Sequence, residues 1–248
     1  MTPVGIVKIG SSNTGFLAAA SLLTPMARVG YLIDLQNPEN WPRLIEKLGE
    51  FRRLCVNLGV VRGLAAGGEV VRQNPLLQDM ICQTGWPLWA ISGTQEGQVT
   101  WFAVRSQHPQ AGVVIDVGGG STEIIQQGVV QSLPIGAAHY YHQDQWPVLN
   151  AAEEAALVGG TAFFLGKFAG RPTMTQETLN DVLERVLSTP EPKELLALDI
   201  ARQNLVVGGS KVLKALIAQS HINRFIVTSR GLTEGLWIAA SLGRAARL

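Results

Sequence analysis

The chain has 248 residues, of which 46% are apolar and 16% charged, and its formal net charge is +1 at pH 7. This composition supplies enough apolar material for one large domain or two modest ones. No basic run exceeds a doublet such as Arg52-Arg53, which argues against nucleic acid or an anionic membrane surface as a partner. Any bound anion must therefore be held locally, by loops and helix ends.

The N-terminal residues lack the charged-then-apolar layout of a signal peptide, and the apolar stretch 15–23 is too short to span a bilayer. We therefore expect a cytoplasmic protein. The two cysteines, Cys55 and Cys82, fall on apolar faces of expected helices and are predicted to pack in the core. Neither the cysteines nor the four scattered histidines have metal-ligand spacing, so no structural metal is predicted.

The first half of the chain is predicted to alternate strands with helices. In chain order these are strands over 4–9, 16–23 and 27–35, a helix over 41–58, a strand over 60–65, a short helix over 75–84, a strand over 88–91 and a helix over 95–104. The first three strands are expected to form an antiparallel meander. Gly59 and Gly85 follow the first two helices, and Asn74 is expected to cap the short one.

The second half repeats this plan. In chain order we expect strands over 113–116, 122–127 and 129–133, a helix over 162–168, a helix that Thr175 begins, a strand over 205–207 that runs into Gly208-Gly209, a helix over 210–219, a strand over 225–228 and a helix over 232–242. The hairpins over 4–23 and 113–133 look like two copies of one element. We therefore predict an α/β fold of two duplicated domains, 1–104 and 105–248, with both loops facing a shared cleft. A single doubly wound domain is the alternative.

The stretch 113–123 reads Val-Val-Ile-Asp-Val-Gly-Gly-Gly-Ser-Thr-Glu and is the most informative part of the sequence. A buried strand ends near Asp116, and the glycines that follow expose several N–H groups that suit a phosphate. Asp116 can hold a divalent cation, and Ser121 and Thr122 add hydroxyl donors. The alternative is a glycine-rich turn without a ligand. A strand follows the glycines, which excludes a dinucleotide fingerprint, and no Gly-Lys-Ser/Thr marks a P-loop.

Five motifs in order resemble the exopolyphosphatase and guanosine pentaphosphate phosphohydrolase family. The resemblance implies the duplicated, ribonuclease H-like fold of actin, the sugar kinases and the heat-shock chaperone ATPases. The motifs are Ser-Gly-Thr-Gln-Glu-Gly at 92–97, the glycine loop at 116–123, Leu-Pro-Ile-Gly-Ala at 133–137, Gly-Gly-Thr-Ala at 159–162 and Ser-Arg-Gly-Leu-x-Glu-Gly at 229–235. Together they indicate a common fold, while activity depends on the residues of the site.

The resemblance also implies roles for individual residues. Glu96 falls where the family has the general base that acts on the attacking water. Asp116 and Glu123 would bind Mg²⁺, or another divalent cation, or would order its waters. The phosphate-binding residues would be Lys8, Ser12, Asn13, Thr14, Gly118, Gly119, Gly120, Ser121, Thr122, Gly159, Gly160 and Thr161.

The chain departs from the family pattern at several points. Lys8 stands where the family has an Asp that helps to hold the metal, and one residue is added to that loop. A Lys cannot bind Mg²⁺, but it is a point cation that can meet phosphate directly. Val70 and His139 stand where the family has arginines, and each loss removes a charge-assisted phosphate contact. The link from 138 to 159 is short, so a family helix is expected to be missing, and no C-terminal helical extension is expected.

Three functions are consistent with these residues. The first is hydrolysis of a terminal phosphoanhydride, with inorganic polyphosphate as the first candidate substrate and guanosine pentaphosphate as the second. The second is a catalytically impaired protein that binds polyphosphate or an alarmone as a sensor. The third is an ATP-dependent kinase of small molecules, for which only Gly208-Gly209 suggests an adenosine pocket. A homodimer is left open.

Overall fold

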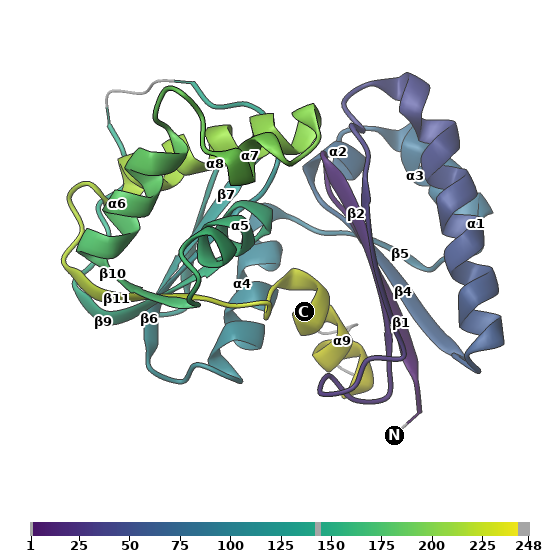
Figure 1. Ribbon diagram of the computed structural model, residues 1–248. Helices are drawn as coiled ribbons and strands as arrows, with labels where there is room; N and C mark the ends of the chain where they lie inside the picture. The colour runs from purple at the N-terminus through teal and green to yellow at the C-terminus, as the bar shows by residue number, and fades with distance from the viewer. Residues whose placement is uncertain (1, 142–144, 243–248) are drawn as a thin grey trace. The chain divides into compact units, whose positions relative to one another are not determined.

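The computed structural model describes residues 2–141 and 145–242 (Figure 1). The chain divides into two compact units. Unit 1 comprises the first hundred residues together with the segment that begins at Leu232, and unit 2 comprises Trp101–Gly231. This division differs from the predicted domains 1–104 and 105–248, because the C-terminal helix packs against a strand from the start of the chain. Such a return of the chain cannot be inferred from local sequence pattern.

Unit 1 is built on a mixed sheet with the strand order β3-β2-β1-β4-β5. The predicted meander is confirmed, because the first three strands are antiparallel, whereas β1, β4 and β5 are parallel. Its strands are β1 (Val4–Ile9), β2 (Asn13–Ala19), β3 (Ala27–Leu32), β4 (Arg62–Gly67) and β5 (Leu88–Ala90). Its helices are η1 (Pro38–Asn40), α1 (Trp41–Asn57), α2 (Glu69–Arg72), α3 (Pro75–Gln83), the first part of α4 (Gly93–Arg105), and α9 (Leu232–Ser241).

Alternation along β1 gives the sheet of unit 1 two apolar faces. Val7 and Ile9 join the core under α1 and α3, while Ile6 joins a second core that includes Leu236 and Trp237 of α9. Figure 1 shows α1 and α9 on opposite faces of this sheet. The face that carries Ile6 also carries Lys8, so the lysine leaves the sheet on the side that α9 covers.

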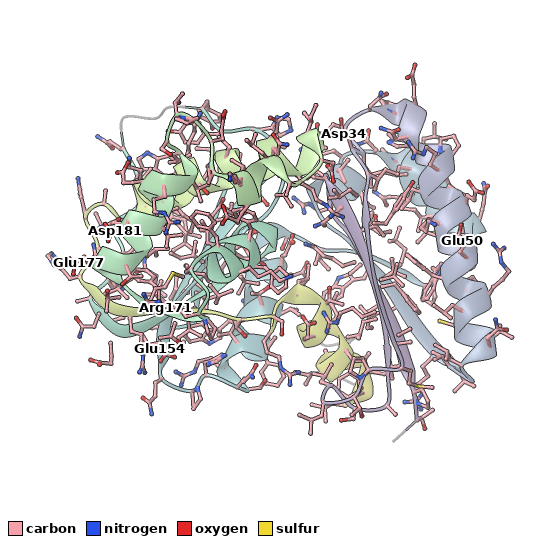
Figure 2. The ribbon with its side chains drawn as sticks, viewed as in Figure 1. Asp34, Glu50, Glu154, Arg171, Glu177 and Asp181 are labelled. Atoms are coloured by element: carbon pink, nitrogen blue, oxygen red, sulfur yellow. The ribbon has the colours of Figure 1, made fainter. Side chains whose placement is uncertain are left out.

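Unit 2 has the strand order β10-β11-β9-β6-β7-β8. Its strands are β6 (Ala111–Val117), β7 (Thr122–Gln126), β8 (Val129–Leu133), β9 (Ala152–Val158), β10 (Thr173–Thr175) and β11 (Ile222–Val227). Its helices are α5 (Gly160–Phe168), α6 (Gln176–Val186), α7 (Lys193–Leu196) and α8 (Ile200–Ile217). The apolar sides of α5, α6 and α8 contribute to one core with this sheet, and Figure 2 shows Glu177 and Asp181 on the outer side of α6.

The two sheets repeat one topology, as the sequence predicts. β3-β2-β1-β4 in unit 1 corresponds to β8-β7-β6-β9 in unit 2, with an antiparallel meander followed by a parallel neighbour in each. The predicted fold class of duplicated α/β domains is therefore confirmed. The alternative of one doubly wound domain is wrong, because the strands form two separate sheets.

The strand predicted over 205–207 is wrong. These residues and Gly208-Gly209 lie inside α8, which continues to Ile217. Both glycines are buried, and a methyl group at Gly209 would collide with the side chain of Thr161 on α5. The glycines therefore allow close packing inside a helix and do not end a strand. Tertiary packing overrides the β-propensity of the valines that precede them.

Smaller expectations also differ from the structure. β9 and β10 lie in stretches where no strand is predicted. Asn74 precedes α3, but its amide donates to the carbonyl of Val70 at 2.6 Å instead of capping the helix. Cys55 is buried as predicted, and burial raises the pKa of its thiol, an effect that the Arg52 guanidinium partly offsets. Cys82 is exposed, so its predicted place in the core is wrong.

Candidate functional site

The hairpins β1–β2 and β6–β7 have the same backbone geometry. The last paired residues are Ile9 and Thr14 in one hairpin and Val117 and Thr122 in the other, and each pair encloses four turn residues. The first turn residue donates its N–H to the carbonyl of the fourth at 2.9 Å in both hairpins. The register therefore makes Lys8 the counterpart of Asp116, and Gly15 the counterpart of Glu123.

The glycine turn of unit 2 is held from behind by the motif at 133–137. Ala137 and Ala138 donate their N–H groups to the carbonyls of Gly118 and Gly119, each at 2.8 Å. Gly136 fits here because a Cβ would lie 2.5 Å from the Gly119 carbonyl oxygen. Among the described residues, the N–H groups of Gly119 and Gly120 donate to no protein acceptor. The carbonyls of Gly118 and Gly119 belong to the same peptide groups as these two N–H donors, so fixing the carbonyls on one side leaves the N–H groups available to an anion on the other.

Of the two predicted hydroxyl donors in this hairpin, Thr122 is already engaged. It is fully buried, and its hydroxyl donates to the carbonyl of Ile135 at 2.7 Å. Thr122 therefore holds the turn against the segment that follows β8 and leaves only its backbone for a ligand. Ser121 is half-buried at the end of the turn.

Asp116 and Glu123 face each other across β6 and β7. They are direct partners in an antiparallel register, so their side chains emerge on one face of the sheet. Their exposed fractions are 6% and 2%. Ser132 donates its hydroxyl to a Glu123 carboxylate oxygen at 2.8 Å. The strand pairing thus brings together the two residues for which a metal-binding role is predicted.

The segment Gly159-Gly160-Thr161 lies beside the end of β6. Gly159 has φ +98°, and a Cβ there would lie 2.8 Å from the Val117 carbonyl oxygen and 3.2 Å from an Asp116 carboxylate oxygen. Helix α5 begins at Gly160, and the N–H groups of its first turn have no partners within the helix. The Thr161 side chain points elsewhere, since its hydroxyl donates to the Leu205 carbonyl of α8 at 3.4 Å.

The first hairpin places its predicted residues differently. Lys8 is half-buried, and its side chain runs toward the turn, with Cε 3.7 Å from where a Gly10 Cβ would lie. Ser12 is half-buried and Asn13 exposed in the turn. Thr14 is fully buried on the face opposite Lys8, and its hydroxyl has no hydrogen-bond partner in the described part of the chain.

Glu96 is positioned by a capping box at the start of α4. The Gln95 side chain accepts from the Ser92 N–H at 2.9 Å, while the Gln95 N–H donates to the Ser92 hydroxyl at 3.2 Å. Glu96 follows in the first turn, half-buried, with a carboxylate oxygen 3.2 Å from where a Gly68 Cβ would lie. Gly68 donates to the Ile9 carbonyl at 3.1 Å, so Glu96 lies at the carboxyl ends of β1 and β4.

The structure also shows where Val70 and His139 lie, the two residues that stand in place of family arginines. Val70 is 6% exposed and belongs to the core of unit 1, so it offers nothing to a ligand. His139 is exposed just after the segment that holds the glycine turn. Within the described residues, no cluster of three or more His, Cys, Asp or Glu side chains could hold a metal ion.

Residues 34–156 match the family described as the Ppx/GppA phosphatase family. The chain belongs to this family. The match includes the capping box with Glu96, the glycine turn and both carboxylates, and so the resemblance that the motifs suggest is confirmed. Membership supports phosphatase function in general. A search of curated proteins gives no match.

Several solved structures have a fold similar to that of this chain. The structure of an exopolyphosphatase from Cytophaga hutchinsonii has 17% identity to this chain and a TM-score of 0.82, and the match covers 97% of this chain and 98% of that one. A structure of the Aquifex aeolicus Ppx/GppA family member has 20% identity and a TM-score of 0.76, with 98% of each chain covered. At these identities the likeness shows a shared fold. Within the described residues, no helix is long and apolar enough to cross a membrane.

Proposed function

We propose that this Ppx/GppA family member hydrolyses the terminal phosphoanhydride of a phosphate chain. One observation carries the proposal: the glycine turn of unit 2 offers the N–H groups of Gly119 and Gly120 next to the paired carboxylates Asp116 and Glu123. Donors and carboxylates at one strand end suit a phosphoryl group that arrives with a divalent cation. Family membership supports the same reaction class.

The two carboxylates fit Mg²⁺. This ion prefers oxygen ligands and is usually held by one or two carboxylates, with waters and substrate phosphates completing its shell. Asp116 and Glu123 supply such a pair, and their burial gives the negative charges little water to screen them. When bound, the ion would neutralise charge on the phosphoryl oxygens. No third protein carboxylate is needed for this arrangement.

In the proposed mechanism, Glu96 orients a water molecule and accepts its proton as the oxygen attacks the terminal phosphorus. The bond from phosphorus to the bridging oxygen breaks, and the shortened chain leaves with that oxygen. The N–H groups of Gly119, Gly120 and the first turn of α5 stabilise the negative charge on the transferred group. The proposal requires that Glu96 of unit 1 and the glycine turn of unit 2 act on the same phosphate.

Substitution of Glu96 by Gln tests the mechanism. Glu96→Gln retains the shape of the side chain but cannot accept a proton, so phosphate release from polyphosphate with Mg²⁺ should fall by about 100-fold or more. Glu46→Gln, at an exposed position of α1, makes the same change away from the site and should leave the rate unchanged. Equal rates for Glu96→Gln and wild type, with both folded, would remove Glu96 from the mechanism.

Inorganic polyphosphate is the first substrate to test, and guanosine pentaphosphate is the second. The reason to test the nucleotide is a cavity of about 380 Å³ in unit 2. Ala137 and Ala138, which hold the glycine turn, form part of its lining, together with Tyr140, Asn204 and Lys211. An aromatic ring and amide groups suit a nucleobase but not a bare phosphate chain. Comparing kcat/KM for the two substrates decides between them.

A sensor that binds phosphate chains without hydrolysing them is the second candidate function. Lys8 favours it, because a lysine occupies the position that holds Asp116 in the other hairpin. Calorimetry with polyphosphate and Mg²⁺, beside a phosphate-release assay, separates the two functions. Binding without turnover supports the sensor, while turnover that depends on Glu96 supports the hydrolase.

A further inference from the structure

The first hairpin has the backbone of a phosphate turn but none of the carboxylates that a metal ion would need. At the register positions where unit 2 has Asp116 and Glu123, unit 1 has Lys8 and Gly15. The formal charge at these two positions is therefore −2 in unit 2 and +1 in unit 1. A hairpin with this charge attracts a phosphate oxygen directly and repels a divalent cation.

The Lys8 ammonium is a candidate partner for an anion. Within the described residues it makes no hydrogen bond and no ion pair, although the side chain is half-buried. The other lysine of unit 1, Lys47, pairs with Glu50 at 2.6 Å and lies over the Tyr31 ring. A half-buried lysine without a protein partner has lost part of its hydration and gains most from an anionic ligand.

Helix α9 adds a second polar group on the same face of the sheet. Gly15, the cross-strand neighbour of Lys8, has the Thr233 hydroxyl 3.9 Å from where its Cβ would lie. Thr233 is in the first turn of α9, whose N–H groups have no partners within the helix. The first-turn acid of this helix, Glu234, is paired with Arg28 at 2.5 Å, which offsets its negative charge.

We propose that Lys8 and Thr233 form an anion site in unit 1 that binds a phosphoryl group without a divalent cation. The lysine serves as a built-in cation, and the ligand class is an inorganic or nucleotide-linked phosphate chain. The choice of ligand rests on the proposed function, but the site itself rests on residues of unit 1 alone. The chain then retains affinity for phosphate chains after chelation of divalent ions, with Lys8 providing the retained part.

Calorimetric titration with tripolyphosphate tests this site in EDTA and in Mg²⁺. In EDTA, wild type should bind, and Lys8→Met should bind about 10- to 100-fold more weakly, the effect of losing one charge-assisted hydrogen bond. Lys47→Met removes the same charge from the same unit and should change the affinity less than about threefold. Thr233→Val should weaken binding by about threefold to tenfold.

A reverse substitution adds a readout that does not depend on turnover. Lys8→Asp should abolish binding in EDTA, and its binding should recover as Mg²⁺ is added, because the carboxylate then supplies a metal ligand. Circular dichroism and thermal melting establish that each variant is folded. The site is overturned if wild type does not bind in EDTA, or if folded Lys8→Met binds there as tightly as wild type.

These outcomes are separate from those of the hydrolase. Lys8-dependent binding without phosphate release would overturn the proposed hydrolysis and keep the anion site. Phosphate release that depends on Glu96, together with binding in EDTA that is insensitive to Lys8, would do the opposite.

Discussion

The β1–β2 hairpin and the β6–β7 hairpin share their register and turn but differ in the side chains that could contact a ligand. Both close on a buried threonine and a 2.9 Å turn hydrogen bond. One presents a lysine opposite a glycine, and the other an aspartate opposite a glutamate. The backbone donors are therefore a property of the duplicated fold, while two register positions decide whether a hairpin suits a metal ion or an anion.

The largest effect should come from removing the metal-binding character of the second hairpin. Asp116→Asn keeps the shape of a side chain that is 6% exposed but removes its charge. If Mg²⁺ is held there, phosphate release should fall by about 100-fold or more, and more Mg²⁺ should be needed for half-maximal rate. Asp181→Asn, at an exposed position on α6, is the matched control (Figure 2). If the Mg²⁺ dependence of Asp116→Asn is unchanged, the proposal that the second hairpin binds a metal ion is wrong.

The next effect concerns the backbone that supports the second hairpin. Gly159→Ala places a side chain at φ +98° and 2.8 Å from the Val117 carbonyl oxygen, so it should lower the free energy of unfolding by about 2–4 kcal/mol. At Gly160, no atom lies within 4 Å of the new Cβ, and Gly160→Ala should stay within about 0.5 kcal/mol of wild type. Urea unfolding measures both. Equal losses of unfolding free energy in the two variants would show that the turn does not depend on the absence of a side chain at Gly159.

Much of this architecture can be predicted from the sequence, because its signals are local. The meander of unit 1 and the glycine turn of unit 2 follow from alternation and from glycine content. β9 could not be predicted, since Ala-Glu-Glu-Ala-Ala has the composition of a helix. It is a strand because β6 and β11 pair with it on both sides.

The candidate site likewise contains features that follow from local sequence and features that depend on tertiary packing. The pairing of Asp116 with Glu123 can be predicted, because a tight hairpin fixes the register of its two strands, whereas their role as metal ligands rests on the family resemblance. Thr233 could not be found, because it approaches Gly15 only through the return of α9 to the sheet of unit 1. Nor could the sequence reveal that Gly68 leaves room for the Glu96 carboxylate, since their proximity depends on the order of the parallel strands.

The smallest expected effect compares the two buried threonines that close the hairpins. Thr122→Val removes the hydroxyl that donates to the Ile135 carbonyl at 2.7 Å and leaves that carbonyl without its donor. The free energy of unfolding should fall by about 1–3 kcal/mol. Thr14→Val removes a hydroxyl that has no partner among the described residues, so it should be neutral or stabilise by up to about 1 kcal/mol.

Both threonines are fully buried and both substitutions preserve side-chain volume, so denaturant unfolding isolates the hydroxyl in each hairpin. This difference has one cause: Thr122 bonds the second hairpin to the segment after β8, whereas the Thr14 hydroxyl has no hydrogen-bond partner among the described residues. A loss for Thr14→Val as large as that for Thr122→Val would mean that the first hairpin is fastened too. The two hairpins would then differ in charge alone. Fixing of the turn by a buried threonine could then no longer be considered a feature of unit 2, where the metal-binding residues are proposed.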